Sequence, residues 1–421
     1  MPAAVSSQMR RLVGKPADEV VEAAATGLLA ALARVGDPRS RFGRHYPLAS
    51  VLALAACAVT CDANGFTAIA QWAGDLSEQQ RARFGLVRGR YTRRIRTPSE
   101  RTFRALLAAV DPAELLDAVG RYVTHRLERA GMAKIPEQVS KEREARRRAK
   151  AGAATGHGLR VLAADGKTLR GSGRTRHQRT HLVAFVDQAT GRVAERIGVD
   201  GKTNETPTVR AHVATIELDD AVLTADAAHT CRATAQAIID AGGHYLMIVK
   251  RNTPRLFGQI AEILLTGQNA AEVGEHHTWS ERGHGRITRR VLRAAPAEGI
   301  DFPGAAQVMI TQRHRRPINA GIRESRQLVY AVTSLTREHA DPEVLAQIEQ
   351  RHWGCEARHH ILDVTFGEDH CQARAGHAPA NLSTLRDLAI DTFRATGHVN
   401  IAHARRHHTH DAERVLDLYE L

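Results

Sequence analysis

The sequence predicts an α/β fold in which an all-helical region precedes a sheet-containing domain. Two observations support this prediction. In the first 130 residues, apolar positions recur at helical spacing behind helix-start signals, as in residues 48–60 and 97–107. From residue 159 the pattern changes to short apolar runs separated by turns, which is typical of strands. With 421 residues, the chain is long enough for two or three domains.

Composition favours a polyanionic partner. The formal net charge is +13 and the sequence pI is about 10.0, which indicates nucleic acid before membrane. A solvated basic surface without a specific partner is the alternative. The longest apolar run, Leu48–Thr60, is too short to span a bilayer, and we expect no signal peptide. Five scattered Cys predict reduced thiols, with Cys57 and Cys61 in a core, and a cytoplasmic chain.

The helical region is predicted to cover residues 1–130. Two helices are separated by a break at residues 62–65, a start signal lies at residues 97–100, and another helix runs from Pro112 to about Arg129. Short helices around a turn would suit DNA binding by a helix-turn-helix variant, and an ordinary helical bundle is the alternative. Residues 131–158 contain a strongly charged run followed by small residues, which indicates a basic linker. Its basic part would either lie along DNA phosphates or simply be solvated.

The second region predicts a specific order of elements. Three strands joined by short turns indicate an antiparallel meander, after which helices and strands alternate. This order, three strands, helix, strand, helix, strand, is that of a ribonuclease-H-like fold. The predicted elements are strand 161–164, strand 181–187, strand 193–199, helix 206–218, a strand ending at Asp226, helix 231–243 and strand 245–249.

Three carboxylates give this order a chemical meaning. Asp165 and Asp226 each follow an apolar strand, so their side chains are expected at one edge of the sheet. Adjacent carboxylates repel unless a divalent cation bridges them. Glu356 lies on a later helix that begins at Asp341, and it completes an oxygen-only set suited to Mg²⁺. Two ions are expected, with Mn²⁺ as a substitute. Either aspartate alone is also typical of a turn cap.

About 130 residues separate Asp226 from Glu356, which is more than the fold needs. Strand patterns predict a β-rich insertion at about residues 252–335. At its turn, His284 and Arg286 are candidates for DNA contact, with an exposed hairpin as the alternative. A zinc site on the late helix is a weaker hypothesis, because zinc ligands normally converge from two elements; its candidates are His352, Cys355, His359 and His360. Residues 396–421 are interpreted as a solvated basic tail.

Several blocks of the sequence resemble a known family. DGKTLRGS, KTNET, LTADAAHT, SERGHGRITRR and RHWGCE followed by LDVTFGED occur in the order found in bacterial insertion-sequence transposases with an Asp-Asp-Glu triad, of the ISAs-type (H-repeat-associated) group. The resemblance covers nearly the whole chain. It implies a ribonuclease-H-like catalytic domain, placed at residues 159–395, Mg²⁺ dependence, transposon-end and target DNA as double-stranded substrates, a homodimer on DNA, and a place on the bacterial nucleoid.

The resemblance also assigns residues. Asp165 and Asp226 match the first and second catalytic aspartates, and Glu356 matches the catalytic glutamate; all three would hold metal. Ala357 stands where the family usually has asparagine, and residues 359–361 replace a leucine-histidine-tryptophan run. The predicted activity is hydrolysis at transposon ends and strand transfer; the alternatives are an inactive DNA-binding remnant or regulator and a metal-dependent nuclease. The candidate DNA-binding residues are Lys167, Arg170, Lys250, Arg251, His284, Arg286, Arg351 and His352.

Overall fold

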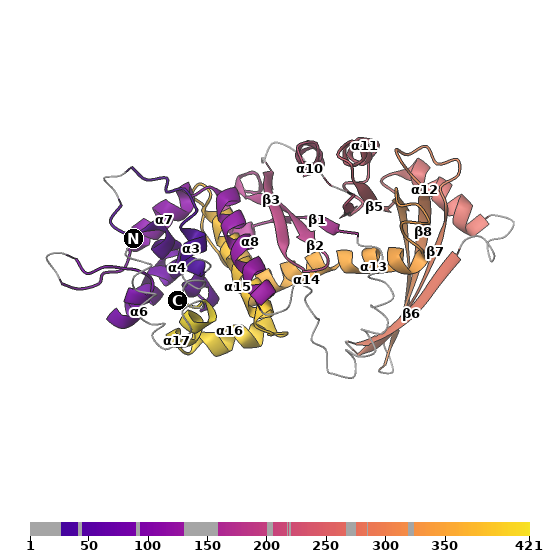
Figure 1. Ribbon diagram of the computed structural model, residues 1–421. Coiled ribbons are helices and arrows are strands. Elements are labelled where there is room, and N and C mark those ends of the chain that lie inside the picture. Colours follow the sequence, from indigo (N-terminus) through magenta and orange to yellow (C-terminus); the bar gives the residue numbers. More distant parts are fainter. Residues whose placement is uncertain are drawn as a thin grey trace.

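The computed structural model describes most of the chain and shows an elongated molecule (Figure 1). Helices form one end, and a large sheet with helices on both faces forms the rest. The described residues are 27–40, 44–89, 93–129, 159–199, 205–216, 218, 220–266, 275–283, 285–318 and 324–421. The predicted basic linker, residues 131–158, lies outside them. No helix in the described part has the length and apolar character needed to traverse a bilayer.

The sheet begins with the predicted meander. Strands β1 (Val161–Thr168), β2 (His181–Asp187) and β3 (Val193–Val199) pair in antiparallel fashion. Strands β4 (Val222–Ala225) and β5 (His244–Val249) then add on the other side of β1, and both run parallel to it. The resulting order is β3-β2-β1-β4-β5. The predicted succession of strands and helices is therefore present.

Four further strands extend this sheet. They are β6 (Glu275–Gly283), β7 (Arg286–Pro296), β8 (Gln307–Pro317) and β9 (Ser325–Thr333). Strand β9 pairs with β5 in antiparallel fashion, and β8, β7 and β6 follow outward to complete nine strands. The predicted β-rich insertion is thus present, as a continuation of the same sheet. Helix α12 (Pro254–Ala261) precedes these strands, and a π-helical turn, Glu262–Thr266, follows it.

Two helical layers cover the sheet. On one face, α10 (Glu205–Val213), α11 (Arg232–Asp240) and α12 pack over apolar residues such as Leu162, Ala164 and Leu223. On the other face, α13 (Pro342–His352) packs over Val222 and Met309, and α14 (Gly354–His360) continues along the sheet toward β1 (Figure 1). Because successive strand residues point to opposite faces, this assignment decides which side chains share a surface.

The helical end contains both the early and the late helices. Their buried residues form a single apolar cluster. The helices are α3 (Leu28–Leu32), α4 (Leu48–Thr60), α5 (Phe66–Asp75), α6 (Glu78–Arg83), α7 (Glu100–Ala109), α8 (Pro112–Arg129), α15 (Ala378–Ala395), α16 (Ile401–Thr409) and α17 (Ala412–Leu418). Ser99 caps α7, as its position predicts. All five cysteines are free, and Cys57 and Cys61 are buried in this core as expected.

The prediction of a solvated C-terminal tail is wrong. Residues 401–418 form two helices whose apolar side chains, Leu416 among them, are buried in the helical core. Tyr419 is fully buried, and its Oη lies 2.8 Å from Thr60 Oγ1. The basic run misled the interpretation because it is amphipathic. Arg405 and His408 turn inward, and the other basic side chains of α16 lie on its outer face.

Candidate active site

The two predicted aspartates lie side by side on neighbouring parallel strands. The last register pair between β1 and β4 is Ala164 with Ala225; Asp165 is the next residue of β1, and Asp226 directly follows β4. Backbones of paired strands are about 4.8 Å apart, so Asp165 and Asp226 begin from adjacent positions. The sequence predicted that the strand ends just before Asp165. This prediction is wrong, because β1 continues to pair with β2 up to Thr168. Only the parallel ladder ends there.

Both aspartates face α13 and α14. On β1, Ala163 packs against Cys355 of α14, and Asp165 shares that face because it is two residues further along. On β4, Thr224 Oγ1 lies 2.8 Å from Nδ1 of His352, and Asp226 is again two residues further along. The strand alternation therefore directs both carboxylates to the helix that carries Glu356.

Glu356 follows a residue that fixes its helix to β1. Cys355 is buried, with Sγ 3.6 Å from the carbonyl oxygen of Ala163, whereas Glu356 is exposed. Partial burial and, after it, the charge of Asp165 raise the pKa of Glu356 above its ordinary value. The structure thus brings Glu356 into electrostatic range of the first aspartate.

His359 is a neighbour of Asp165 that sequence reasoning named only as a possible zinc ligand. Its Nδ1 lies 3.3 Å from Asp165 Oδ2. The available signal was its spacing of three residues from Glu356, which places both side chains on one face of α14. Sequence reasoning also missed Glu205, whose carboxylate lies against Gly166 on the opposite face of β1.

The predicted late helix is not continuous. Asp341 caps it as expected, with Oδ1 accepting a hydrogen bond from Val344 N at 2.9 Å. Helix α13 nevertheless ends at His352, and α14 begins at Gly354 and passes into a π-helical turn, Ile361–Thr365. The break lets His352 reach β4 while Cys355 packs under β1.

Among the described residues, no three side chains of His, Cys, Asp or Glu stand close enough together to hold a metal ion. The zinc hypothesis therefore gains no support within this part of the chain. Its candidates serve other contacts, since Cys355 packs on β1 and His352 bonds Thr224. The two aspartates accept hydrogen bonds from nearby backbone N–H groups. Asp165 Oδ1 accepts from Gly166 N, and Asp226 Oδ1 accepts from Ala228 N, each at 2.9 Å.

A buried network anchors α14 to the helical end. Arg358 is 2% exposed; its Nε lies 2.7 Å from Asp387 Oδ1 and its Nη1 lies 2.9 Å from Asp391 Oδ1, both on α15. Arg196 of β3 approaches the other oxygen of Asp387. Burial acts to raise the pKa of Asp387, but the charges of Arg358 and Arg196 outweigh it and lower that pKa. This network fixes α14, and with it Glu356, against α15.

The predicted DNA contacts have different surroundings. Lys250 and Arg251 are exposed and follow β5, at the same sheet edge as the aspartates. Arg170 and Arg351 are also exposed, and Arg170 pairs with Asp369 at 3.2 Å. Two of the predicted residues are engaged inside the protein.

Lys167 and His352 are those two residues. The Lys167 side chain is 12% exposed, with Nζ 2.5 Å from Asp363 Oδ1. Burial lowers the pKa of His352, whose Nδ1 lies 2.8 Å from Thr224 Oγ1. Arg286 is exposed at the start of β7, and His284 lies outside the described residues. DNA binding by all of these side chains stays a prediction.

Arg286 belongs to a larger group on the face that α13 covers, here termed the arginine cluster. Its members are Arg286, Arg290, Arg313 and Arg315. Arg290 and Arg313 are direct partners across β7 and β8. Burial, then the charges of the other three arginines, lower the pKa of Arg313.

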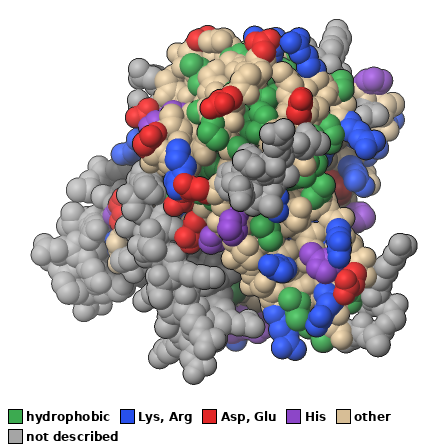
Figure 2. Space-filling model, turned by 90° about the vertical axis from the view of Figure 1, so that its right-hand side faces the viewer, with side chains coloured by type: hydrophobic (Ala, Val, Ile, Leu, Met, Phe, Trp, Pro, Cys, Tyr) green, Lys and Arg blue, Asp and Glu red, His purple; other side chains and the backbone are tan. Residues whose placement is uncertain are grey.

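The arginine cluster is only partly compensated within the described residues. Glu281 lies 2.7 Å from Arg290, and the guanidinium of Arg313 lies over the ring of Trp353 at 5.0 Å. The charge of Arg313 also acts to lower the pKa of Glu356, against the larger effects of burial and Asp165. Figure 2, in which the right-hand side of Figure 1 faces the viewer, shows Lys, Arg and His side chains scattered over the right and lower right of the surface, with a few acidic side chains among them.

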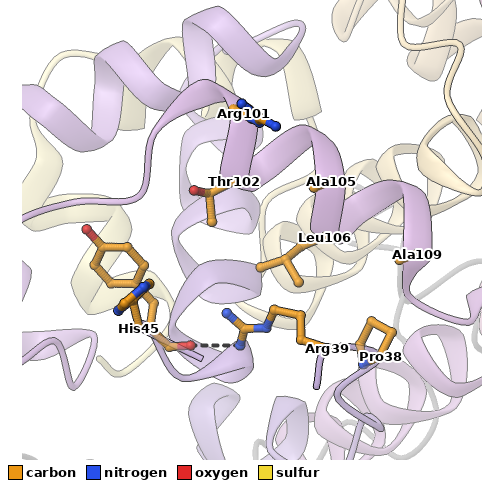
Figure 3. Close-up of a pocket in the computed structure, with 9 residues that line it drawn as sticks. Pro38, Arg39, His45, Arg101, Thr102, Ala105, Leu106 and Ala109 are labelled. Carbon is orange, nitrogen blue, oxygen red and sulfur yellow. Dashed lines mark hydrogen bonds between the residues drawn. The ribbon is translucent and has the colours of Figure 1, made fainter. Parts of the chain in front are cut away.

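A separate pocket of about 430 Å³ lies in the helical end, away from the carboxylates. Figure 3 shows Arg101, Thr102 and Leu106 of α7 on one side and Arg39 on the other. Arg39 is held by Asp37 at 2.8 Å and donates to the carbonyl oxygen of Tyr46. Helix α7, part of the helical region predicted to bind DNA, therefore borders this pocket, and its role in DNA binding stays a prediction.

Comparison with models of known families shows which family this chain belongs to. Residues 156–389, more than half of the chain, match the model described as transposase DDE domain. The chain belongs to this transposase family. Residues 29–123 match a second model, described as DDE_Tnp_1-associated. The resemblance noted in the sequence is confirmed.

Individual relatives agree with this assignment. The chain is 29% identical over 243 residues to "H repeat-associated putative transposase YhhI" and, at the same identity, to "Putative protein YbfL", both of Escherichia coli strain K12. Each match covers 55% of this chain and 63% of the relative. "Putative transposase YncI" of Escherichia coli O157:H7 is 25% identical over 244 residues, with coverage of 56% and 62%. The matches thus span less than two thirds of these relatives.

Proposed function

We propose that this protein is an insertion-sequence transposase that cuts at transposon ends and joins them to target DNA. The observation that carries the proposal is the register of β1 and β4. It places Asp165 and Asp226 next to each other, facing the helix that bears Glu356. The sheet order supports a ribonuclease-H-like catalytic domain. We also propose that it acts at the bacterial nucleoid and that its active form is a homodimer bound to DNA.

By its chemistry the donor set fits a divalent cation, although in this structure Asp165, Asp226 and Glu356 do not stand close enough together to hold one. Asp165, Asp226 and Glu356 offer only carboxylate oxygens, which Mg²⁺ prefers and Mn²⁺ accepts. Burial and, after it, the like charge of Asp165 raise the pKa of Glu356. These three residues would hold the metal. Bound metal would supply a more acidic attacking hydroxyl and charge stabilisation at the phosphate.

The chain's own residues position the DNA. Lys250 and Arg251 lie at the sheet edge beside the aspartates, where their charges would bind phosphates flanking the scissile bond. The arginine cluster continues this positive surface along the insertion strands. In the first step, water attacks the phosphorus and the 3′-oxygen leaves as a hydroxyl. In the second step, that hydroxyl attacks a target phosphodiester, and the target's own 3′-oxygen leaves.

The test is a cleavage and joining assay with DNA carrying the element's ends. Asp226→Asn and Glu356→Gln should each lower cleavage by about 10³-fold or more, because each removes a charged ligand. DNA affinity measured by fluorescence anisotropy should change little. Asp187→Asn is a matched control, because Asp187 also ends a strand but caps the following turn, accepting from Thr190 N at 2.8 Å.

The outcomes separate the rival functions. Cleavage without joining in the wild type would identify a nuclease. DNA binding without cleavage, unchanged in Asp226→Asn, would identify a DNA-binding remnant or regulator, an outcome that the altered residues beside Glu356 make worth testing. Cleavage and joining that both depend on Asp226 and Glu356, but not on Asp187, would establish the transposase.

A further inference from the structure

Behind the two aspartates, on the face covered by α10, a carboxylate is held between two histidines. Glu205, the first residue of α10, has Oε2 at 2.9 Å from His181 Nε2 and Oε1 at 2.6 Å from His229 Nε2. The Glu205 side chain is 27% exposed and that of His229 only 2%. Burial acts to raise the pKa of Glu205, but the two hydrogen bonds outweigh it and lower that pKa to about 2. The carboxylate is therefore ionised and fixed in place.

The two histidines belong to the segments that carry the aspartates. His181 of β2 is the register partner of Thr168 of β1, and its Nδ1 lies 2.8 Å from Thr168 Oγ1. His229 lies in the turn that follows Asp226, and its backbone N–H donates to the Asp226 carbonyl oxygen at 3.2 Å. Glu205 thus joins the end of β1 and β2 to the turn after β4.

A neighbouring residue adds a second link. Thr206 Oγ1 donates to the carbonyl oxygen of Ala228 at 3.0 Å, within the turn that also contains Asp226. The first two residues of α10 therefore both contact this turn. Their contacts lie on the opposite face of the sheet from the aspartate side chains.

Gly166 shows how closely Glu205 approaches β1. A Cβ atom at Gly166 would lie 2.4 Å from both carboxylate oxygens of Glu205, far inside van der Waals contact. A side chain at this position would displace the carboxylate from its histidines. Since Gly166 directly follows Asp165, the absence of a side chain lets Glu205 lie against the backbone of the first aspartate's strand.

We propose that Glu205 is a positioning residue that sets the separation of Asp165 and Asp226 by joining the strand of one to the turn of the other. The inference rests on the proposed function, because it concerns carboxylates that would hold the metal. Glu205 acts through Gly166 and His229. Outer residues of this kind typically change metal affinity by 10- to 100-fold when removed.

The experiment measures Mn²⁺ affinity of the full-length protein without DNA, from the electron paramagnetic resonance signal of free Mn²⁺. Glu205→Ala should weaken binding by about tenfold or more. The matched control is Glu195→Ala, because Glu195 of β3 also bonds a histidine, His212, at 2.5 Å, but at a place where no aspartate-bearing segment is joined. This control should bind Mn²⁺ within about twofold of the wild type, since the loss of one carboxylate–histidine contact away from the aspartates is not expected to reach the site.

Two further variants separate positioning from simple destabilisation. Glu205→Gln should retain near-wild-type affinity. Its amide oxygen can accept from His181, and its amide N–H can donate to His229 in the other tautomer, because His229 Nδ1 has no hydrogen-bond partner among the described residues. Gly166→Ala should weaken Mn²⁺ binding as Glu205→Ala does. The double variant should be no weaker than Glu205→Ala alone, because both changes act through one carboxylate.

The inference is overturned if Glu205→Ala binds Mn²⁺ as tightly as the wild type, or if the losses in Gly166→Ala and Glu205→Ala simply add. Should Glu205→Ala not fold, Gly166→Ala and Glu205→Gln decide, with melting curves as the check of folding. A folded Gly166→Ala variant of unchanged affinity also overturns it. A wild type that neither binds Mn²⁺ nor cuts DNA ends overturns the proposed function itself.

Discussion

At the residue scale, Glu356 lies where its negative charge is unfavourable. Burial and the charge of Asp165 raise its pKa, despite the nearby positive charges of Arg313 and Lys250. A raised folded-state pKa means that the ionised carboxylate destabilises the fold once the pH exceeds the ordinary value. Such destabilisation is common where residues are placed for function.

We therefore predict that Glu356→Gln melts slightly higher than the wild type in a chelator at neutral pH, because the variant removes the unfavourable charge. Adding Mg²⁺ should raise the melting temperature of the wild type and not that of the variant. Differential scanning calorimetry measures both. Glu128→Gln, at an exposed position on α8, is the control and should change neither value. An equal response to Mg²⁺ in wild type and Glu356→Gln would contradict the assignment of Glu356.

Glu205 gives a pH dependence of the opposite sign. Its pKa is about 2 in the folded protein and 4.5 in the unfolded reference, so the folded state favours the ionised form. Its contribution is complete above pH 4.5 and is lost as the pH falls toward 2. We predict that Glu205→Gln flattens the fall in unfolding free energy across this window by roughly 1–3 kcal/mol. Urea denaturation at pH steps measures it, and an unchanged slope would count against the hydrogen bonds to His181 and His229.

At the element scale, one guanidinium anchors α14 to α15. Arg358 is buried between Asp387 and Asp391, and Nη1 also donates to the carbonyl oxygen of Gly191 at 2.6 Å. Removing one partner of a buried ion pair leaves the other charge without compensation. The short helix that carries Glu356 thus depends on α15 for its placement.

We predict that Arg358→Met lowers the unfolding free energy by about 3–5 kcal/mol, because the buried Asp391 loses its ion-pair partner and the buried Asp387 keeps only Arg196. Arg121→Ala is the control, since Arg121 forms an exposed pair with Asp117 on α8 and should cost about 0.5 kcal/mol or less. Equilibrium urea unfolding measures both. A loss as small as that of the control would mean that α14 is anchored elsewhere.

The helices and strands differ in how well they could be predicted from the sequence. Strands β1 to β5 and helix α8 could be predicted, because each combines a clear apolar period with turn or capping residues. The break at Trp353 could not, since helical periodicity does not show that His352 must reach Thr224. Tertiary contacts decided that boundary.

The candidate site shows the same division. Asp165, Asp226 and Glu356 are recognisable because a strand or helix position and a family block coincide at each. Glu205 was missed because both of its histidine partners lie 24 residues away in sequence, in opposite directions. No local pattern joins residues at that separation.

At the scale of the whole molecule, the net charge of +13 predicts salt-dependent DNA binding. The arginine cluster should contribute part of it. We predict that Arg286→Ala and Arg315→Ala each reduce the slope of log affinity against log salt by about 0.9, the value for one phosphate contact. Fluorescence anisotropy across a salt series measures this. Arg121→Ala, on the helical end, is the control, and equal slopes in all variants would show that the cluster does not contact DNA.

The helical core that draws on α4 and α8 as well as α16 and α17 has a consequence for synthesis on the ribosome. The early helices emerge first, yet Leu416 and Tyr419 complete their core only after the entire sheet has been made. A premature stop codon before this point would leave the early helices with exposed apolar surface and open to proteolysis. Damaged gene copies should therefore yield no stable shortened protein that competes with the intact one for DNA.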